Sequence, residues 1–122
     1  ALKALLEDGY DFAYIHVEAP DEMGHQGLVK EKIQAIEWID EKIVKVLVEE
    51  FDKAGEDYRM LILPDHPTPI RVRTHTAEPI PYMLYDSRKN LECQEMYSEK
   101  IAQANGIAWA NGYELIDYLL ER

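Results

Sequence analysis

The chain has 122 residues, with 24 acidic side chains against 13 Lys and Arg, so its formal charge is −11 with neutral histidines. This length suits a single domain over residues 1–122, and the 47% of hydrophobic residues suffice for a core, which excludes disorder. The acidic balance argues against nucleic acid and against an anionic membrane face as partners, because both attract positively charged protein surfaces.

One cysteine, Cys93, is present. A single cysteine excludes a disulfide framework and a Cys-based zinc finger, and it is typical of a reducing compartment. No apolar run approaches the roughly 20 residues that span a bilayer, and the N-terminus has no signal-peptide pattern. These features predict a cytoplasmic α/β chain.

The first elements are short. Residues 1–9 have leucines at helical spacing and a glycine at the end, which predicts the last turns of a helix. Because the chain starts inside this helix without Met or an N-cap, we expect it to be a piece of a longer protein. The apolar run FAYIHV at 12–17 predicts a buried strand, and the Pro- and Gly-containing segment 18–27 predicts a polar loop.

Residues 28–54 form the longest periodic segment, and they predict a helix that ends before Gly55. Its apolar residues recur on one face, with Lys and Glu opposite, and this face is expected to contact the core. The residues concerned are Val29, Ile33, Ile36, Ile43 and Leu47.

The second half of the chain predicts two strands and two helices. The all-apolar run MLIL at 60–63 is expected to be a central strand covered on both faces. A loop at 64–79, a strand at 82–85 and helices at 90–105 and 113–120 follow. Strand, long helix and strand in this order predict a βαβ unit in which 12–17 and 60–63 are parallel.

The first group of candidate ligands is Asp21 and His25, which follow the predicted strand 12–17. A spacing of four places both side chains on one face of a helical turn. A carboxylate and an imidazole so placed can bind one divalent cation. An N-capping Asp and a surface His would produce the same pattern.

The second group is Asp65-His66, directly after the predicted strand 60–63. In open α/β sheets, ligands bind beyond the carboxyl ends of strands. Pro64 and Pro67 restrict the backbone on both sides. A simple turn is the alternative, since Asp is common in turns.

His75 is the third candidate, at the end of the proline-containing loop. A lone histidine is more often a surface residue than a ligand. The order along the chain nevertheless supplies two carboxylates and three imidazoles from three strand ends, enough for one three-ligand metal site and half of a second.

Further residues near these groups each fit two roles. His16 fits a structural role in the predicted strand or a supporting role behind a ligand. Glu18 and Glu22 fit acidic surface or help in orienting a metal. Arg71 and Arg73 fit a phosphate contact or solvated charge.

Three segments together resemble one protein family: FAYIHVEAPDEMGH at 12–25, PDHPTP at 64–69 and THTAEPIP at 74–81. They resemble the carboxy-terminal part of the cofactor-independent phosphoglycerate mutases, in particular the archaeal-type branch, which belong to the alkaline phosphatase superfamily. The resemblance runs roughly from Asp11 to Pro81. It implies an α/β fold, a three-layer sheet with helices on both faces, of which only the carboxy-terminal part is present.

The resemblance implies a site for two divalent ions (Mn, Mg, Co or Zn). Asp21, His25 and His75 would bind one ion, and Asp65 and His66 the other. In the family an upstream Asp and a nucleophilic Ser complete the second site. Ser87 and Ser98 follow the metal motifs rather than precede them, so neither is assigned, and no catalytic residue is placed in this chain.

The activity that the resemblance implies is isomerisation of 3-phosphoglycerate to 2-phosphoglycerate in glycolysis and gluconeogenesis, with Arg71 and Arg73 as candidate substrate contacts. The fragment alone is expected to be inactive. Another phosphatase or phosphomutase of the superfamily, or a non-catalytic metal-binding module, is the alternative. Exposed sheet edges and apolar patches lead us to expect self-association of the fragment.

Overall fold

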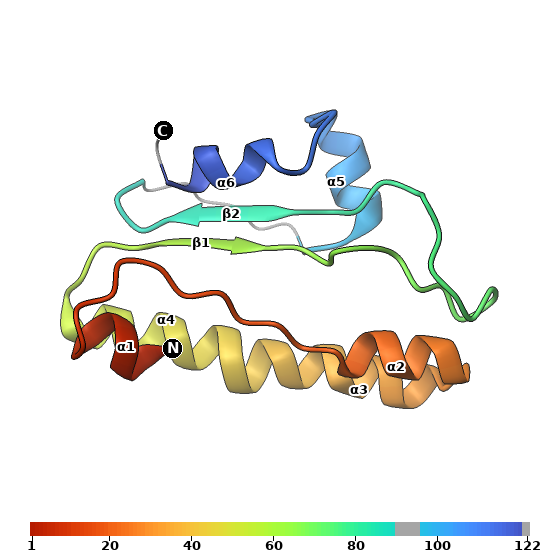
Figure 1. Cartoon of the computed structure of the whole chain (residues 1–122), viewed down its shortest axis with the longest axis horizontal. Coiled ribbons are helices and arrows are strands. Elements are labelled where there is room, and N and C mark those ends of the chain that lie inside the picture. The colour runs from red at the N-terminus through yellow and green to blue at the C-terminus, as the bar shows by residue number, and fades with distance from the viewer. Residues whose placement is uncertain (90–95, 121–122) are drawn as a thin grey trace. The chain divides into compact units, whose positions relative to one another are not determined.

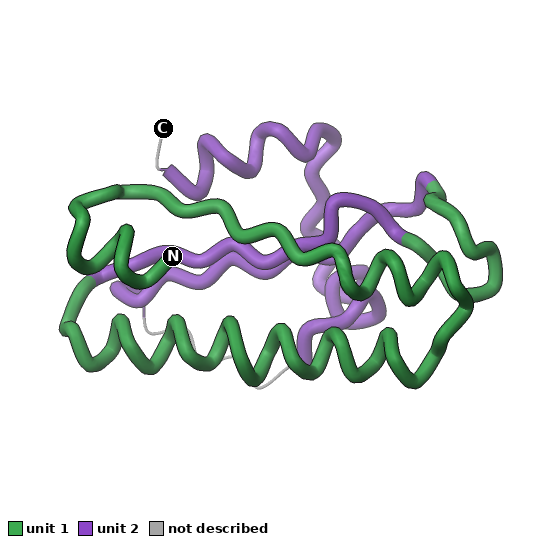
Figure 2. Tube along the Cα trace, turned by 60° about the horizontal axis from the view of Figure 1, so that its bottom comes forward, with its two compact units in different colours: residues 1–56, 68–76 green, residues 57–67, 77–122 purple. Residues whose placement is uncertain are grey.

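The computed structural model describes residues 1–89 and 96–120 (Figure 1). Cys93 and the first part of the helix predicted at 90–105 lie outside the described residues. The chain divides into two compact units (Figure 2). The first unit comprises Ala1–Glu56 and Thr68–Thr76, and the second comprises Asp57–Pro67 and Ala77–Arg122. The single domain expected from the chain length stays a prediction.

The first unit is helical. Its elements are α1 (Leu2–Leu6), α2 (Ala19–Gln26), α3 (Val29–Ile39), the π-helical turn η1 (Asp40–Val44) and α4 (Lys45–Ala54). The last three run on as one continuous helix, which confirms the helix predicted at 28–54. Gly55 ends it with a φ of 71°, a left-handed conformation that glycine adopts without strain. Helix α2 packs on α3, and α1 packs on α4.

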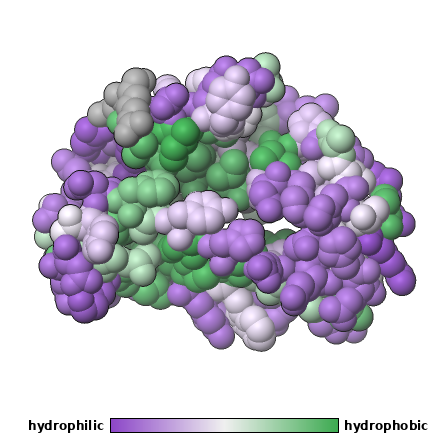
Figure 3. Space-filling model, in the orientation of Figure 1, coloured by the Kyte–Doolittle hydropathy of each residue, from purple (hydrophilic) through white to green (hydrophobic). Residues whose placement is uncertain are grey.

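The predicted apolar face of this long helix is covered only in part. Val29, Ile33 and Ile36 are about half exposed, whereas Ala35 and Phe51 are buried. The prediction that this whole face contacts the core is therefore wrong for its N-terminal half. Periodicity identifies the apolar side of a helix, but another element has to cover it. Hydrophobic side chains are accordingly visible at the surface in Figure 3.

Two predictions for the segment before the long helix are wrong. Residues 12–17 connect α1 to α2 without strand structure, and Tyr14 is 75% exposed. Aromatic and β-branched residues favour strands, but a strand exists only where a partner supplies hydrogen bonds. The loop predicted at 18–27 is mostly helix α2, because Pro20 fits its first turn and Gly27, at φ 74°, caps its end.

The second unit contains β1 (Arg59–Ile62), β2 (Met83–Asp86), α5 (Glu99–Asn105) and α6 (Glu114–Leu119). Both strands lie within one residue of their predicted positions, and α6 confirms the terminal helix. Helix α5 begins at Glu99, where the hydroxyl of Ser98 accepts a hydrogen bond from the Ile101 amide. None of the helices in the described residues is long and apolar enough to cross a membrane.

The predicted parallel pairing of 12–17 with 60–63 is wrong, because 12–17 forms no strand. Strand β1 pairs with β2 in antiparallel register, with Arg59 opposite Asp86 and Ile62 opposite Met83. All four residues of β1 are only partly buried, whereas a central strand was expected to be covered on both faces. An antiparallel pair needs no crossover helix, so the order of elements alone did not exclude this pairing.

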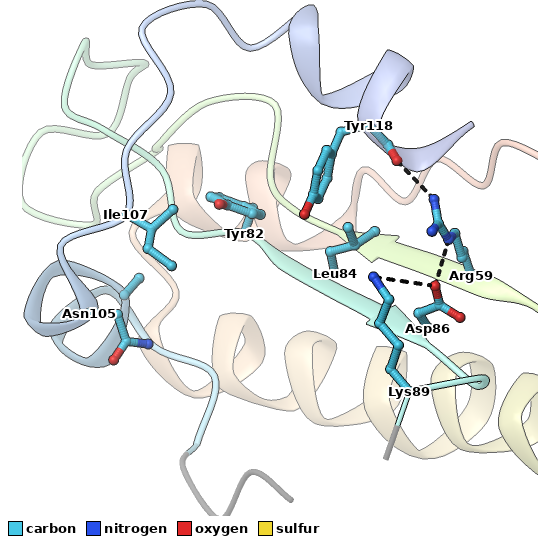
Figure 4. A pocket seen from close by; sticks show the side chains of 9 residues that line it. Arg59, Tyr82, Leu84, Asp86, Lys89, Asn105, Ile107 and Tyr118 are labelled. Atoms are coloured by element: carbon cyan, nitrogen blue, oxygen red, sulfur yellow. Dashed lines mark hydrogen bonds and ion pairs between the residues drawn. The ribbon is translucent and has the colours of Figure 1, made fainter. Parts of the chain in front are cut away.

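An ion pair joins the ends of the two strands. Arg59 Nε donates to Asp86 Oδ2 at 2.8 Å, and the Asp86 side chain is only 5% exposed. Hydrogen bonds from Arg88, from its side chain above all, and from Arg59 hold the pKa of Asp86 well below its usual value. Arg59 also donates to the carbonyl of Tyr118, so α6 is tied to the same pair, at the rim of a pocket of about 440 Å³ (Figure 4).

Replacement of Asp86 tests this pair. A carboxyl whose folded-state pKa lies below its unfolded value of 3.8 stabilises the fold above pH 3.8, and this contribution is lost as the pH falls below it. We expect Asp86→Asn to lower the midpoint of urea unfolding at pH 7. Between about pH 5 and 2 the midpoint of this variant should fall less steeply with decreasing pH than that of the wild type. Asp117→Asn, at an exposed position of α6, is the control and should keep the wild-type profile.

Candidate metal centre

Two segments of the first unit, helix α2 and the loop 68–76, carry three of the predicted ligands. The loop folds back on itself, because the amides of Val72 and Arg73 both donate to the Pro69 carbonyl at 2.9 Å. Arg73 has a φ of 58°, a left-handed conformation that is uncommon for a residue with a side chain. This turn directs the Arg73 carbonyl and His75 toward α2.

The loop approaches α2 closely at one point. A Cβ atom at Gly24 would lie 2.6 Å from the Thr68 carbonyl oxygen and 2.9 Å from its methyl carbon, so only glycine fits there. Lys32 of α3 reaches across and donates to the same Thr68 carbonyl at 2.8 Å. Gly24 and Thr68 are both buried. The close approach therefore anchors the start of the loop against the helix.

Asp21, His25 and His75 converge, as the sequence predicted. The Nε2 atom of His25 lies 3.1 Å from Nε2 of His75 and 3.4 Å from Oδ2 of Asp21. Nε2 of His75 lies 3.4 Å from Oδ1 of Asp21. The three side chains are 36%, 39% and 51% exposed, in the order Asp21, His25, His75, so solvent reaches them.

A backbone carbonyl sets the orientation of the His25 ring. Nδ1 of His25 lies 3.0 Å from the Arg73 carbonyl oxygen. Because a carbonyl only accepts, Nδ1 carries the hydrogen, and in the neutral ring Nε2 keeps its lone pair toward Asp21 and His75. An imidazole held in this way by a second group is the usual arrangement of a metal-ligating histidine.

The carboxylate and the two imidazoles lie close enough together to bind one divalent ion. Bonds of about 2.0–2.1 Å to nitrogen and oxygen in a tetrahedral site place neighbouring ligand atoms about 3.3–3.4 Å apart. The 3.1 Å between the two Nε2 atoms is close to this spacing, and each Nε2 lies 3.4 Å from a different oxygen of Asp21. One carboxylate with two imidazoles also suits Zn, Co or Mn chemically.

Asp65 and His66 follow β1 in the second unit. Oδ2 of Asp65 lies 3.4 Å from Nε2 of His66, while Oδ1 accepts a hydrogen bond from the His66 amide at 3.0 Å. Neighbouring residues thus point their donor atoms to the same side, which a shared ion requires. Their predicted position beside Asp21, His25 and His75 stays a prediction.

The remaining candidate residues have the following environments. His16 is exposed rather than buried in a strand, and its ring stacks on Tyr14 and lies 3.9 Å from a Glu18 oxygen. Glu22 is exposed on α2. The guanidinium of Arg73 lies over the backbone of Gly27, where a Cβ atom would be 2.6 Å from its Nε.

The two serines have structural partners. The hydroxyl oxygen of Ser87 accepts from the Tyr58 amide at 2.9 Å, and Ser98 caps α5.

Sequence reasoning missed three groups at this site: the hydroxyl of Thr68, the ammonium of Lys32 and the carbonyl of Arg73. The Thr68 hydroxyl donates to Asp21 Oδ1. A Thr three residues after Asp65 was visible in the sequence, but its contact with Asp21 joins residues 47 positions apart. A carbonyl belongs to every residue, so no sequence signal distinguishes that of Arg73.

These observations, a helical unit with a convergent carboxylate and two imidazoles, define a metal-binding class of protein. A family model described as the metalloenzyme superfamily matches residues 1–120, and the chain belongs to this family. Divalent metal binding is a property of that class.

The chain is also similar to curated 2,3-bisphosphoglycerate-independent phosphoglycerate mutases, which confirms the resemblance. It is 40% identical over 98% of its length to that of Methanothrix thermoacetophila, and 33% over 99% to enzyme 1 of Archaeoglobus fulgidus. A probable member from Geobacter sulfurreducens is 39% identical over the whole chain. The chain spans 28–30% of the length of these relatives. No solved structure matches it.

Replacement of Gly24 tests the anchoring of the loop. Alanine is favoured over glycine in helices, but at Gly24 its Cβ would clash with the Thr68 backbone. We expect Gly24→Ala to cost about 1–3 kcal/mol of unfolding free energy, as overpacking typically does. Gly112→Ala is the control, because no atom lies within 4 Å of a Cβ there and its φ is not positive. Equal stability of the two variants would contradict the close approach.

Proposed function

We propose that this chain is the metal-binding part of a cofactor-independent phosphoglycerate mutase that interconverts 3-phosphoglycerate and 2-phosphoglycerate. The observation that carries the proposal is the convergence of Asp21, His25 and His75 within 3.1–3.4 Å. The similarity to curated mutases over nearly the whole chain supports the substrate class.

Asp21, His25 and His75 would hold one divalent ion, and Asp65 and His66 would contribute to a second. Mn, Co and Zn accept this mixed set of nitrogen and oxygen donors, whereas Mg prefers oxygen donors. Two bound ions would supply charge neutralisation of the phosphoryl group and a lower pKa of the attacking hydroxyl. The ligand side chains themselves carry negative charge only at the two aspartates, so the pair of sites would remain net positive.

A positive centre matters in this acidic chain. Its formal charge of −11 would repel a phosphoglycerate anion, and cations held by these residues would be the dominant local charges. Arg71 and Arg73, in the same loop as His75, are our candidates for holding the phosphate, since a guanidinium binds phosphate oxygens in pairs. The nucleophilic serine would come from outside these 122 residues, since Ser87 and Ser98 serve the local fold.

The proposal extends to the fold of the longer protein, its location in the cell and self-association of the isolated chain. We propose the three-layer α/β sheet of the alkaline phosphatase superfamily, to which this chain would contribute its carboxy-terminal part. We also propose a cytoplasmic, glycolytic role, supported by the single cysteine and by the names of the relatives. The half-exposed apolar residues of α3 and of 12–17 support self-association of the isolated chain.

Removal of one imidazole should abolish tight metal binding. We expect His25→Ala and His75→Ala each to weaken binding of Co²⁺ or Mn²⁺ by about 100-fold or more, since even a supporting residue behind a ligand contributes 10–100-fold. Isothermal titration calorimetry of the 122-residue chain measures this. His16→Ala is the control histidine and should bind as the wild type does. Unchanged affinity in both His25→Ala and His75→Ala would refute the site.

An activity assay with 3-phosphoglycerate tests the proposed substrate. We expect the 122-residue chain alone to show no turnover. A longer polypeptide containing it should convert 3-phosphoglycerate without bisphosphoglycerate, and only with a divalent metal. Coupling the product to enolase and following absorbance measures this rate. Faster hydrolysis of p-nitrophenyl phosphate than mutase turnover would instead favour a phosphatase of the same superfamily.

A further inference from the structure

We propose that Thr68 is a positioning residue that fixes the Asp21 carboxylate for metal binding through its hydroxyl. The inference rests on the proposed metal role of Asp21, His25 and His75. The contact that Thr68 makes with the site is the hydrogen bond from its hydroxyl to Asp21 Oδ1. It acts on the site only through the rotation of that carboxylate.

The hydrogen bond is placed where it affects both histidine contacts. Oδ1 of Asp21, which accepts from Thr68, lies 3.4 Å from Nε2 of His75. The second oxygen, Oδ2, lies 3.4 Å from Nε2 of His25. The terminal torsion of an aspartate is broad, so a carboxylate without a partner samples many angles. A donor on Oδ1 selects the angle at which each oxygen faces one imidazole.

Thr68 is itself held in place. Its side chain and backbone are buried, with 5% of the residue exposed. Lys32 Nζ donates to its carbonyl at 2.8 Å, and its methyl carbon packs against the bare backbone of Gly24. Because the methyl is fixed, the rotamer of Thr68 is fixed too, and this rotamer places the hydroxyl oxygen beside Asp21. A hydrogen bond to a charged acceptor is among the stronger ones.

The bond contributes to metal affinity in a definite way. A carboxylate already oriented loses little rotational freedom when an ion binds, so more of the interaction energy appears as affinity. Hydrogen-bond partners behind metal ligands typically contribute 10–100-fold in affinity. A Thr68 that only packed the loop would contribute to stability and leave the coordination of a bound ion unchanged.

The test compares Thr68→Ser with Thr68→Ala in the 122-residue chain. Both variants lose the methyl group, and only Thr68→Ser keeps the hydroxyl. The probe is Co²⁺, titrated while visible absorption reports the geometry of the bound ion. We expect Thr68→Ala to bind Co²⁺ about tenfold more weakly than Thr68→Ser and with an altered absorption band. Far-ultraviolet circular dichroism of each variant monitors the fold.

Two controls make the result specific. Thr76, in the same loop and next to His75, has a buried hydroxyl with no hydrogen-bond partner among the described residues. Thr76→Ser and Thr76→Ala should therefore differ by less than about twofold in Co²⁺ affinity. In an Asp21→Asn background, Thr68→Ala should cause little further loss, because coupled residues are not additive.

The outcomes separate the two proposals. Absence of a Co²⁺ band in the wild-type chain would overturn the proposed metal site, and this inference with it. A wild-type band with equal affinity in Thr68→Ser and Thr68→Ala would overturn the role of Thr68 alone. A loss of affinity in Thr68→Ala that accompanies a loss of helical signal would also overturn it, because the hydroxyl would then serve only the fold.

Discussion

The candidate metal centre depends on the close approach of Thr68 to Gly24. A side chain at position 24 would push the loop away, because its Cβ would lie 2.6 Å from the backbone carbonyl oxygen of Thr68. Lys32 donates a hydrogen bond to that carbonyl. The turn at Arg73 then returns the chain to α2, where its carbonyl meets His25 and where His75 meets Asp21. The position of His75 beside Asp21 and His25 thus follows from the packing of this loop on α2.

The side chains of the candidate site are both held in place by neighbouring groups and accessible to solvent. Backbone and hydroxyl partners orient His25 and Asp21 before any ion arrives, which reduces the entropy lost on binding. The donors are nevertheless more than one-third exposed, so an ion can reach them from solvent. Asp86, in the second unit, has a different role. It is buried and contacts Arg59 and Arg88, so its charge stabilises the fold.

Sequence patterns predicted the helices and strands better than they predicted which segments contact one another. The helix at 28–54 and the strands near 60–63 and 82–85 were predicted correctly, because residue preference and periodicity are local properties. The strand at 12–17 and the parallel pairing were wrong, since both require knowledge of which segment lies alongside. The prediction that Ile33 and Ile36 of α3 contact the core was wrong for the same reason.

The order of residues along the chain predicted a group of two carboxylates and three imidazoles, and the resemblance assigned them to two ions; their role as ligands stays a prediction. Their spacing of four places Asp21 and His25 on one face of a helical turn, although the sequence predicted a loop over 18–27 where the structure has helix α2. Only the tertiary structure decided that His75 joins them, that Arg73 supplies a carbonyl and that Thr68 orients the aspartate. These contacts join residues 47 to 50 positions apart. Such distances along the chain are closed by packing, which depends on the shape of every surface involved and has no local signature.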